Sequence, residues 1–413
     1  VVYRLGTYVP IPGINPLSVK SFFDNASSGI LGMFDIFSGG ALTRMSIFAL
    51  GIVPYISASI MMQLFQFIFP SLKEMQKEGD DSSKARIGLY TKYLTLLICI
   101  IQSFAIVVGL ESMPSAGGVS AVVNPGWMFK IVAVCSLTAG TFFILWIGER
   151  ITERGIGNGV SLIIFAGIVS NLPSALTATL SLGEKGVLST FVIIGILVMI
   201  IVVVYGVVFV ETAQRRIVVS YPRRNMGNRL SAQESSYLPL KINNSGVIPP
   251  IFASSILLLP ITIFGFLKLD SNSWLAEYSL YFGHGQIGYL ILYALLIVFF
   301  AFFYVSIVFN PKETADNLKK SGGIILGIRP GGNTADYLSF ILARITTIGA
   351  IYLVLVCLLP EILISKLSVP FYFGGTSLLI IVSVTLDTIT QIQSHVLSSR
   401  YQSLIKKTKL GKK

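Results

Sequence analysis

The sequence predicts an all-α polytopic membrane protein made of two halves with opposite orientations in the bilayer. Of its 413 residues, 53% are hydrophobic and 12% are charged, whereas roughly a quarter of the residues in a soluble domain are charged. Nine windows with at most two charged residues are each about 20 residues long, the length that a helix needs to cross the hydrocarbon core. Two short sequences of the first half recur in the second half in the same order, which indicates a duplication.

The nine windows give the predicted spans in order along the chain. They cover about residues 46–69, 89–110, 127–147, 156–174, 188–210, 245–266, 286–308, 341–362 and 374–394. Several contain Gly and Pro, which spanning helices tolerate when neighbours satisfy the freed backbone groups. The chain opens on Val1 and Val2 without a Met or a charged leader, so no signal peptide is visible, and we expect this start to be the end of a tenth span.

The Lys and Arg residues give each predicted span a direction. When successive loops are placed on alternate sides, all but seven of the 31 Lys and Arg fall on one side. The positive-inside rule makes this basic side, which includes the C-terminal tail, cytoplasmic. The same placement favours a membrane protein over a nucleic-acid-binding protein as the explanation of the net charge of +12. The seven on the outer side are Arg4, Lys20, Arg44, Lys130, Lys185, Lys268 and Lys366.

The repeated sequences run in opposite directions across the membrane. GIVPYISAS at residues 51–59 recurs as GVIPPIFAS at 246–254, and GVSLII at 159–164 recurs as GTSLLI at 375–380. The charge bias directs the first copy of each pair one way and its second copy the other way. The halves are therefore predicted to be inverted repeats, which in membrane proteins often build a pathway at their interface.

The segment before the first span is apolar although it lies on the outer side. Residues 33–48 in particular are too few to cross the membrane as a helix. Such backbone is tolerated at membrane depth only where protein or a water-filled cavity surrounds it. We expect the segment to fold back into a cavity on the outer side, and a packed surface loop is the alternative.

Two cytoplasmic loops, residues 211–244 and 309–340, are long and basic. One interpretation is that they set the topology and attract anionic lipid. The other is a contact point for a partner, which is favoured around Arg329 because Gly and Pro on both sides fix the direction of its guanidinium.

The sequence lacks the residues of most enzyme sites. His284 and His395 are its two histidines, so neither a His-based triad nor a metal cluster is expected, and no cofactor is predicted. The sequence GIGNG at 155–159 resembles a phosphate-binding loop but lacks the Walker lysine. The cysteines Cys99, Cys135 and Cys357 lie in predicted spans, where they serve as small apolar side chains. The chain is therefore not predicted to be an enzyme.

A secondary transporter is the alternative class of function. Transporters usually hold ionisable groups near the bilayer midplane, and the predicted span centres here are almost free of them. Asp387 and Glu361 are near span ends, where we expect each to pair locally near an interface. The transporter interpretation is weakened accordingly.

Aliphatic residues remain along the predicted pathway. Ile52 and Ile56 share one helix face, as do Val160 and Ile164, because residues four apart lie one above the other. The repeats add Ile251 and Ile380 at matching places. If these faces converge they form a constriction that excludes water by dewetting; alternatively they face lipid or a neighbouring helix.

At these residues the chain resembles the SecY family, the channel subunits of the bacterial protein translocon. The resemblance rests on PIPG at 10–13, FSGGAL at 37–42, ERITERGIGNG at 149–159, FNPKETADNLKKSG at 309–322, GIRPG at 327–331 and PFYFGGTS at 370–377. It implies ten helices in two inverted five-helix halves, residues 1–185 and 186–413, with the first helix largely missing. It also implies a protein-conducting channel that translocates unfolded secretory polypeptides and releases transmembrane segments into lipid through a lateral gate.

The resemblance assigns roles to particular residues. It implies a plug helix at about residues 33–48, and a lateral gate, lined by Ser57 and Leu259, between the spans from 46 and 89 and those from 245 and 286. The implied pore ring is Ile52, Ile56, Val160, Ile164, Ile251 and Ile380; the plug includes Phe37, Ser38, Gly39, Gly40, Ala41, Leu42, Thr43 and Arg44; and the motor and ribosome dock at Arg223, Arg224 and Arg329.

The resemblance also implies partners and a location. The expected partners are SecE and SecG in a heterotrimer, the SecA motor, the ribosome, SecDF and YidC, together with signal peptides, nascent chains and membrane lipid. Partners must supply the energy, because no nucleotide site is predicted. The expected location is the bacterial cytoplasmic membrane, with the C-terminus in the cytoplasm.

Overall fold

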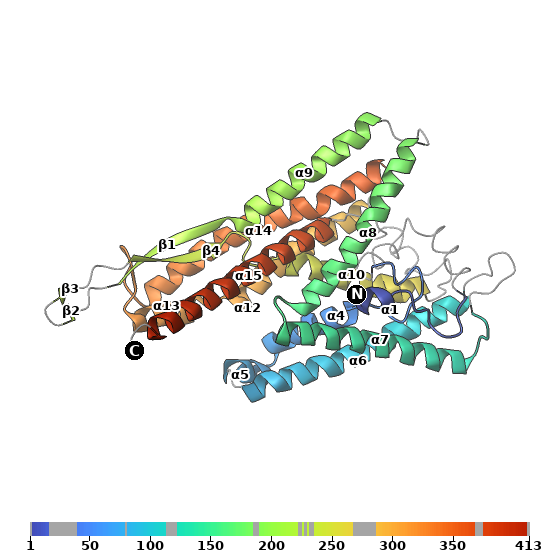
Figure 1. Cartoon of the computed structure of the whole chain (residues 1–413), viewed down its shortest axis with the longest axis horizontal. Coiled ribbons are helices and arrows are strands. Elements are labelled where there is room, and N and C mark those ends of the chain that lie inside the picture. Colours follow the sequence, from blue (N-terminus) through green and yellow to red (C-terminus); the bar gives the residue numbers. More distant parts are fainter. Residues whose placement is uncertain are drawn as a thin grey trace.

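The structure is a computed structural model that describes residues 2–15, 39–78, 81–112, 122–184, 190–221, 225–226, 229–230, 235–266, 286–367 and 375–410. Long helices dominate these residues (Figure 1). Six helices are long and apolar enough to cross a membrane. They belong to α6 (Asp81–Ser112), α7 (Trp127–Arg154), α9 (Thr190–Thr212), α12 (Ile287–Val308), α14 (Gly332–Leu367) and α15 (Gly375–Leu410).

The other three predicted spans are also helical, with shorter apolar stretches. They are α4 (Val53–Ile68), α8 (Gly159–Glu184) and α10 (Ile248–Phe266). All nine predicted spans are therefore confirmed as helices. A short helix, α1 (Val2–Gly6), precedes them, and α5 (Pro70–Glu78) follows α4.

The start of the first predicted span is wrong, because α4 begins at Val53 and not at residue 46. Pro54 occupies the first turn of α4, where its missing N–H costs nothing. Before it, Met45 and Gly51 have left-handed backbone, with φ of 44° and 55°, and a helix cannot continue through such residues. The chain between residues 39 and 52 forms turns instead.

The long basic loops carry a small sheet that the all-α prediction missed. β1 (Gln214–Ser220) pairs antiparallel with β4 (Ser235–Lys241), and β5 (Ile324–Ile325) adds to the other edge of β1. The hairpin extends beyond the ends of the helices and carries β2 (Asn225–Met226) and β3 (Arg229–Leu230) near its tip (Figure 1). Its base buries Ile217, Val219, Leu240 and Ile325 against Leu338, Ile341 and Ile345 of α14.

The helix α13 (Pro311–Ser321) shows how local sequence sets an element. The Asn310 side chain accepts a hydrogen bond from the backbone N–H of Glu313, and Pro311 starts the first turn. Gly322 ends the helix with left-handed backbone at φ 76°, which glycine adopts without a steric penalty.

The helices form two groups that meet along two seams. The helices α4, α6 and α7 pack in sequence, and α10, α12, α14 and α15 pack in sequence on the other side, with α9 against α15 (Figure 1). At the first seam, α10 contacts both α4 and α6. At the second seam, α8 contacts α15. The candidate site lies between these seams.

Candidate functional site

The structure brings the six predicted aliphatic residues together. Ile164 of α8 and Ile380 of α15 are buried in one cluster, and Ile56, Val160 and Ile251 pack against it. The side chains come from α4, α8, α10 and α15, two helices from each half. They face one another across the junction of the halves, so the alternative in which they face lipid is not supported.

The sixth residue, Ile52, is in the neighbouring cluster, which Ile56 and Val160 also contact. Ile52 caps the start of α4, and the backbone N–H of Ile56 donates to its carbonyl at 3.1 Å, so the two side chains stack one turn apart. The exposed fractions are 4% for Ile52, 7% for Ile164 and 1% for Ile380. These three side chains are thus buried, whereas Ile56, Val160 and Ile251 are partly exposed.

A polar cavity adjoins this constriction. Its volume is about 440 Å³, and its wall includes Val247 and Val384, which also contact the aliphatic cluster. Lys241 and Asp387 line the cavity with their charged groups 3.9 Å apart. The predicted local pairing of Asp387 is thus confirmed. The side chain of Glu361 lies outside the described residues.

One hydrogen bond joins the two halves beside this cavity. The backbone N–H of Gly157 donates to Oε1 of Gln391 on α15 at 2.8 Å. The turn before α8 is itself fixed, because the N–H of Gly159 donates to Oγ1 of Thr152 at 2.9 Å. A Cβ on Gly159 would collide with the carbonyl of Gly148 on α7, so glycine permits the close approach of α7 and α8.

The segment before α4 folds back into the protein, as predicted. Ala41, Leu42, Met45 and Phe48 are each less than 9% exposed. The N–H of Ile11 donates to the carbonyl of Met45 at 3.0 Å, which ties the segment to the chain that follows α1. The backbone of residues 39–48 forms turns where the resemblance implied a helix, and Phe37 and Ser38 lie outside the described residues.

The predicted gate residues lie on helices of the first seam. Ser57 of α4 is 4% exposed, and its Oγ has no hydrogen-bond partner in the described part of the chain. Leu259 lies in α10, but its side chain is outside the described residues. Nearby, the rings of Phe67 on α4 and Phe303 on α12 meet edge to face with centroids 5.6 Å apart. A groove of about 1040 Å³ opens between the ends of α4 and α12 and the start of α13.

The three predicted docking arginines have different outcomes. Arg329 is exposed in the turn between β5 and α14, and its carbonyl accepts a hydrogen bond from Oγ1 of Thr334 at 2.9 Å. Gly327 and Gly331 flank it with φ of 83° and 112°, so the turn holds this guanidinium outward, as predicted. Arg223 and Arg224 lie outside the described residues.

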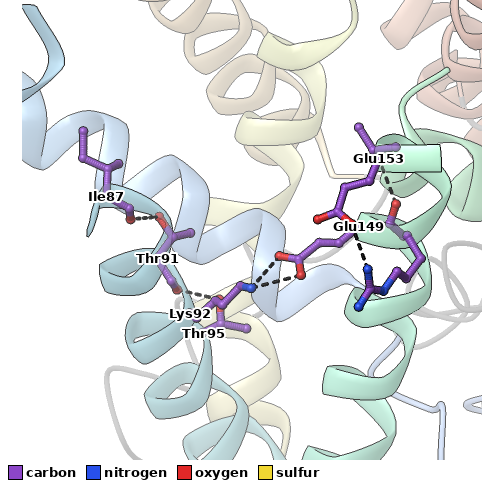
Figure 2. A network of polar contacts seen from close by, with 9 residues as sticks. Ile87, Thr91, Lys92, Thr95, Glu149 and Glu153 are labelled. Atoms are coloured by element: carbon purple, nitrogen blue, oxygen red, sulfur yellow. Dashed lines mark hydrogen bonds and ion pairs between the residues drawn. The ribbon is translucent and has the colours of Figure 1, made fainter. Parts of the chain in front are cut away.

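An ion pair that sequence reasoning missed joins α6 and α7. Nζ of Lys92 is 2.8 Å from Oε1 and 3.0 Å from Oε2 of Glu149 (Figure 2). The next residue of α7, Arg150, pairs with Glu153 at 3.1 Å. Glu149 opens the ERITERGIGNG sequence, so its place in a motif was a signal, but nothing in the sequence identified Lys92 as its partner.

The comparisons with known proteins agree with this arrangement. Residues 46–389 match the SecY family. Protein translocase subunit SecY of Escherichia coli (strain K12) is 50% identical over 99% of this chain and 92% of its own length. The same subunit of Rickettsia bellii is 48% identical over 99% of this chain and 94% of its own length.

Solved structures have the same fold. A protein-conducting channel aligns with a TM-score of 0.64 at 18% identity, over 96% of this chain and 90% of that one. A second structure, which concerns the plug domain of SecY that stabilises the closed state of the channel and maintains a membrane seal, gives the same TM-score, identity and coverage. Sec61 from the canine ribosome–channel complex aligns at 0.61 with 18% identity and the same coverage. From the match over residues 46–389 and the identity over nearly the whole chain, this protein belongs to the SecY family.

Proposed function

We propose that unfolded polypeptides cross the membrane through the constriction formed by Ile52, Ile56, Val160, Ile164, Ile251 and Ile380. As a member of the SecY family, the chain is a polytopic membrane protein and a protein-conducting channel. The observation that carries the residue assignment is the convergence of these side chains from four helices of both halves, beside a polar cavity.

The chemistry of the constriction suits a channel that must accept any sequence. Aliphatic side chains offer no hydrogen bonds or charges, so a passing polypeptide is held weakly and does not stall. When no polypeptide is present, the same side chains pack together and exclude water, which blocks ions by dewetting. The segment at about residues 33–48, of which the structure describes 39–48, acts as the plug and adds a second barrier on the outer side.

The seam between α10 and the pair α4 and α6 serves as the lateral gate, with Ser57 and Leu259 along it. A segment of about 20 apolar residues gains more free energy in lipid than in an aqueous cavity, so it leaves sideways when the seam opens. The contact of Phe67 with Phe303 closes the same side in the described state. The halves, residues 1–185 and 186–413, move as the two sides of this gate.

The energy for transport comes from partners, and the chain itself is not an enzyme. SecE and SecG complete the channel complex, SecA and the ribosome dock on the basic loops at Arg223, Arg224 and Arg329, and SecDF and YidC assist. The Sec61 and Ssh1 structures that share this fold come from ribosome-bound complexes, which supports the ribosome as a partner. The complex resides in the bacterial cytoplasmic membrane with its C-terminus in the cytoplasm.

A crosslinking experiment tests the pore assignment. A secretory chain stalled in transit should crosslink to photoreactive probes at Ile56 and Ile251, because both side chains face the constriction. A probe at Ile201 is the control, since this α9 side chain is 68% exposed on the outside of the bundle. Equal labelling at all three positions would sink the assignment.

A secondary transporter is less well supported than a channel. Its required midplane ion site has one described candidate, Asp387, and this carboxylate already faces Lys241 beside a solvent-accessible cavity. Saturable uptake of a small solute by the purified protein, abolished by Asp387→Asn, would revive the transporter interpretation.

A further inference from the structure

The side chain of Arg4 joins three separate parts of the chain. Nη1 of Arg4, in α1, donates to the carbonyl of Gly39 at 2.6 Å and to Oγ of Ser170 at 3.0 Å. Gly39 begins the described part of the segment before α4 that folds back into the protein, which we call the re-entrant segment. Ser170 lies on α8. Oγ1 of Thr7 donates to the carbonyl of Arg4 at 2.7 Å, which fixes the backbone that carries the guanidinium.

The re-entrant segment lies directly on the backbone of α8 at this point. A Cβ on Gly39 would be 3.1 Å from Cα of Gly167 and 3.3 Å from Oγ of Ser170. Gly39 has φ of 67°, a backbone conformation that favours glycine. Oγ of Ser170 donates in turn to the carbonyl of Gly167 at 2.8 Å, so its lone pairs are oriented toward Arg4.

The same helix carries the constriction. Val160 and Ile164 of α8 belong to the aliphatic cluster, and Ile168, one turn beyond Ile164, is buried in it. Gly167 directly precedes Ile168, and Ser170 lies two residues after it. The contact of Arg4 therefore holds the re-entrant segment to a helix that also forms the seal.

We propose that Arg4 is a positioning residue that clamps the base of the plug onto α8 and so keeps the resting channel closed. The inference rests on the proposed function of the segment that includes residues 39–48 as the plug. A guanidinium that donates to two oxygens makes charge-assisted hydrogen bonds, which are about twice as strong as neutral ones. The plug cannot leave α8 without breaking at least the bond to Gly39. Arg4 thus sets part of the barrier that a signal sequence must overcome before transport starts.

The experiment measures how often the plug leaves its place. The reporter substitution Thr43→Cys is introduced together with Cys99→Ala, Cys135→Ala and Cys357→Ala, and the complete complex is studied in membrane vesicles. A membrane-impermeant maleimide added from the outer face labels the reporter when the segment moves away. Arg4→Gln should raise the labelling rate about tenfold, because an uncharged amide makes weaker hydrogen bonds than a guanidinium. Arg4→Lys, which keeps the charge and a donor, should restore part of the protection.

Further variants separate clamping from a general loss of structure. Ser170→Ala removes one acceptor and leaves α8 intact, so a smaller rise in the same direction is expected, and it carries the test if Arg4→Gln does not accumulate. Arg150→Gln, on the exposed surface of α7, is the matched control and should leave labelling unchanged. Arg4→Gln should also export a precursor with a weakened signal sequence faster than the parent does.

The outcomes distinguish this inference from the function on which it rests. Labelling of both Arg4→Gln and Ser170→Ala at the parental rate would overturn the clamp. Crosslinks at Ile56 and Ile251 would in that case still support the pore assignment. Rapid labelling of the parent itself, at the rate of an unfolded control peptide, would show that residues 39–48 do not occlude the channel. The plug assignment would then fail before the clamp is tested.

Discussion

At the residue scale, the constriction depends on side chains that are both apolar and compact. Ile164 and Ile380 are nearly inaccessible to water, although Val384 of the same cluster lines a polar cavity. A β-branched side chain has few rotamers, so the packing can close again in the same arrangement after a polypeptide has passed. A polar group at the same place would keep water in the constriction and weaken the seal.

A substitution at Ile164 tests this seal. Ile164→Asn places an amide in the aliphatic cluster, so water should enter and the ion conductance of resting channels in planar bilayers should rise about tenfold. Ile164→Val, which removes one methylene but stays apolar, should keep the conductance near that of the parent. A leak of equal size in both variants would mean that packing volume, and not polarity, forms the barrier.

A charge reversal tests the docking role of Arg329. Arg329→Glu should abolish motor-driven export into vesicles if the motor docks at this exposed turn as proposed, while assembly of the complex stays normal on a native gel. Lys84→Glu, an exposed reversal at the start of α6, is the control and should have little effect. Export by Arg329→Glu at the parental rate would contradict the assignment.

At the element scale, the spans could be predicted far better than their ends. Each span is a long apolar stretch with few charges, and hydropathy alone identifies such a stretch. The start of α4 depended instead on Pro54 and on left-handed backbone at Gly51, which interrupt an apolar run without changing its hydropathy. The β1–β4 hairpin was missed because Ile217 and Val219 are apolar positions within a basic loop, and their partner surface on α14 is more than 100 residues away in the sequence.

In the candidate site, the apolar side chains could be predicted from the sequence but the polar contacts could not. The repeats and the helical period predicted which aliphatic side chains share a face, so Ile52, Ile56 and their counterparts could be identified. The polar contacts could not, because each joins residues far apart in the sequence. Gly157 and Gln391 are 234 residues apart, and Arg4 and Ser170 are 166 apart.

The ion pair between α6 and α7 gives an element-scale prediction. The side chains of Lys92 and Glu149 are 42% and 35% exposed, so solvent screens their attraction. A double-mutant cycle with Lys92→Gln and Glu149→Gln should give a coupling of about 0.5 kcal/mol in detergent unfolding experiments. The cycle for Arg150 and Glu153 should give a similar or smaller value, and a coupling several times larger would indicate that the pair at Lys92 is shielded from water.

At the scale of the whole molecule, the two helix groups are held by different chemistry at their two seams. The seam of α10 with α4 and α6 is bordered by the aromatic contact of Phe67 with Phe303, whereas the seam of α8 with α15 lies beside the hydrogen bond from Gly157 to Gln391. Apolar contacts do not fix a geometry as strictly as hydrogen bonds do. The first seam is therefore expected to open while the second stays together.

A crosslink tests which seam opens. Cysteines at Phe67 and Phe303, joined by a short cleavable bifunctional reagent, should block the release of an apolar segment into lipid, and cleavage of the reagent should restore it. The control pair, Phe299→Cys with Phe303→Cys, lies within α12 and should have no effect. Normal release from the first crosslinked pair would place the exit elsewhere.

The hairpin β1–β4 has a mechanical consequence. Its tip reaches beyond the helices, but its base is rooted in a dry contact between Ile217 and Leu240 on the strands and Leu338 and Ile341 on α14. The seven-residue strands β1 and β4 pair along their full length and are held to α14 by this contact. A force that displaces this paired base is therefore expected to act on α14 and, through the packing of α14, on α12 and α15.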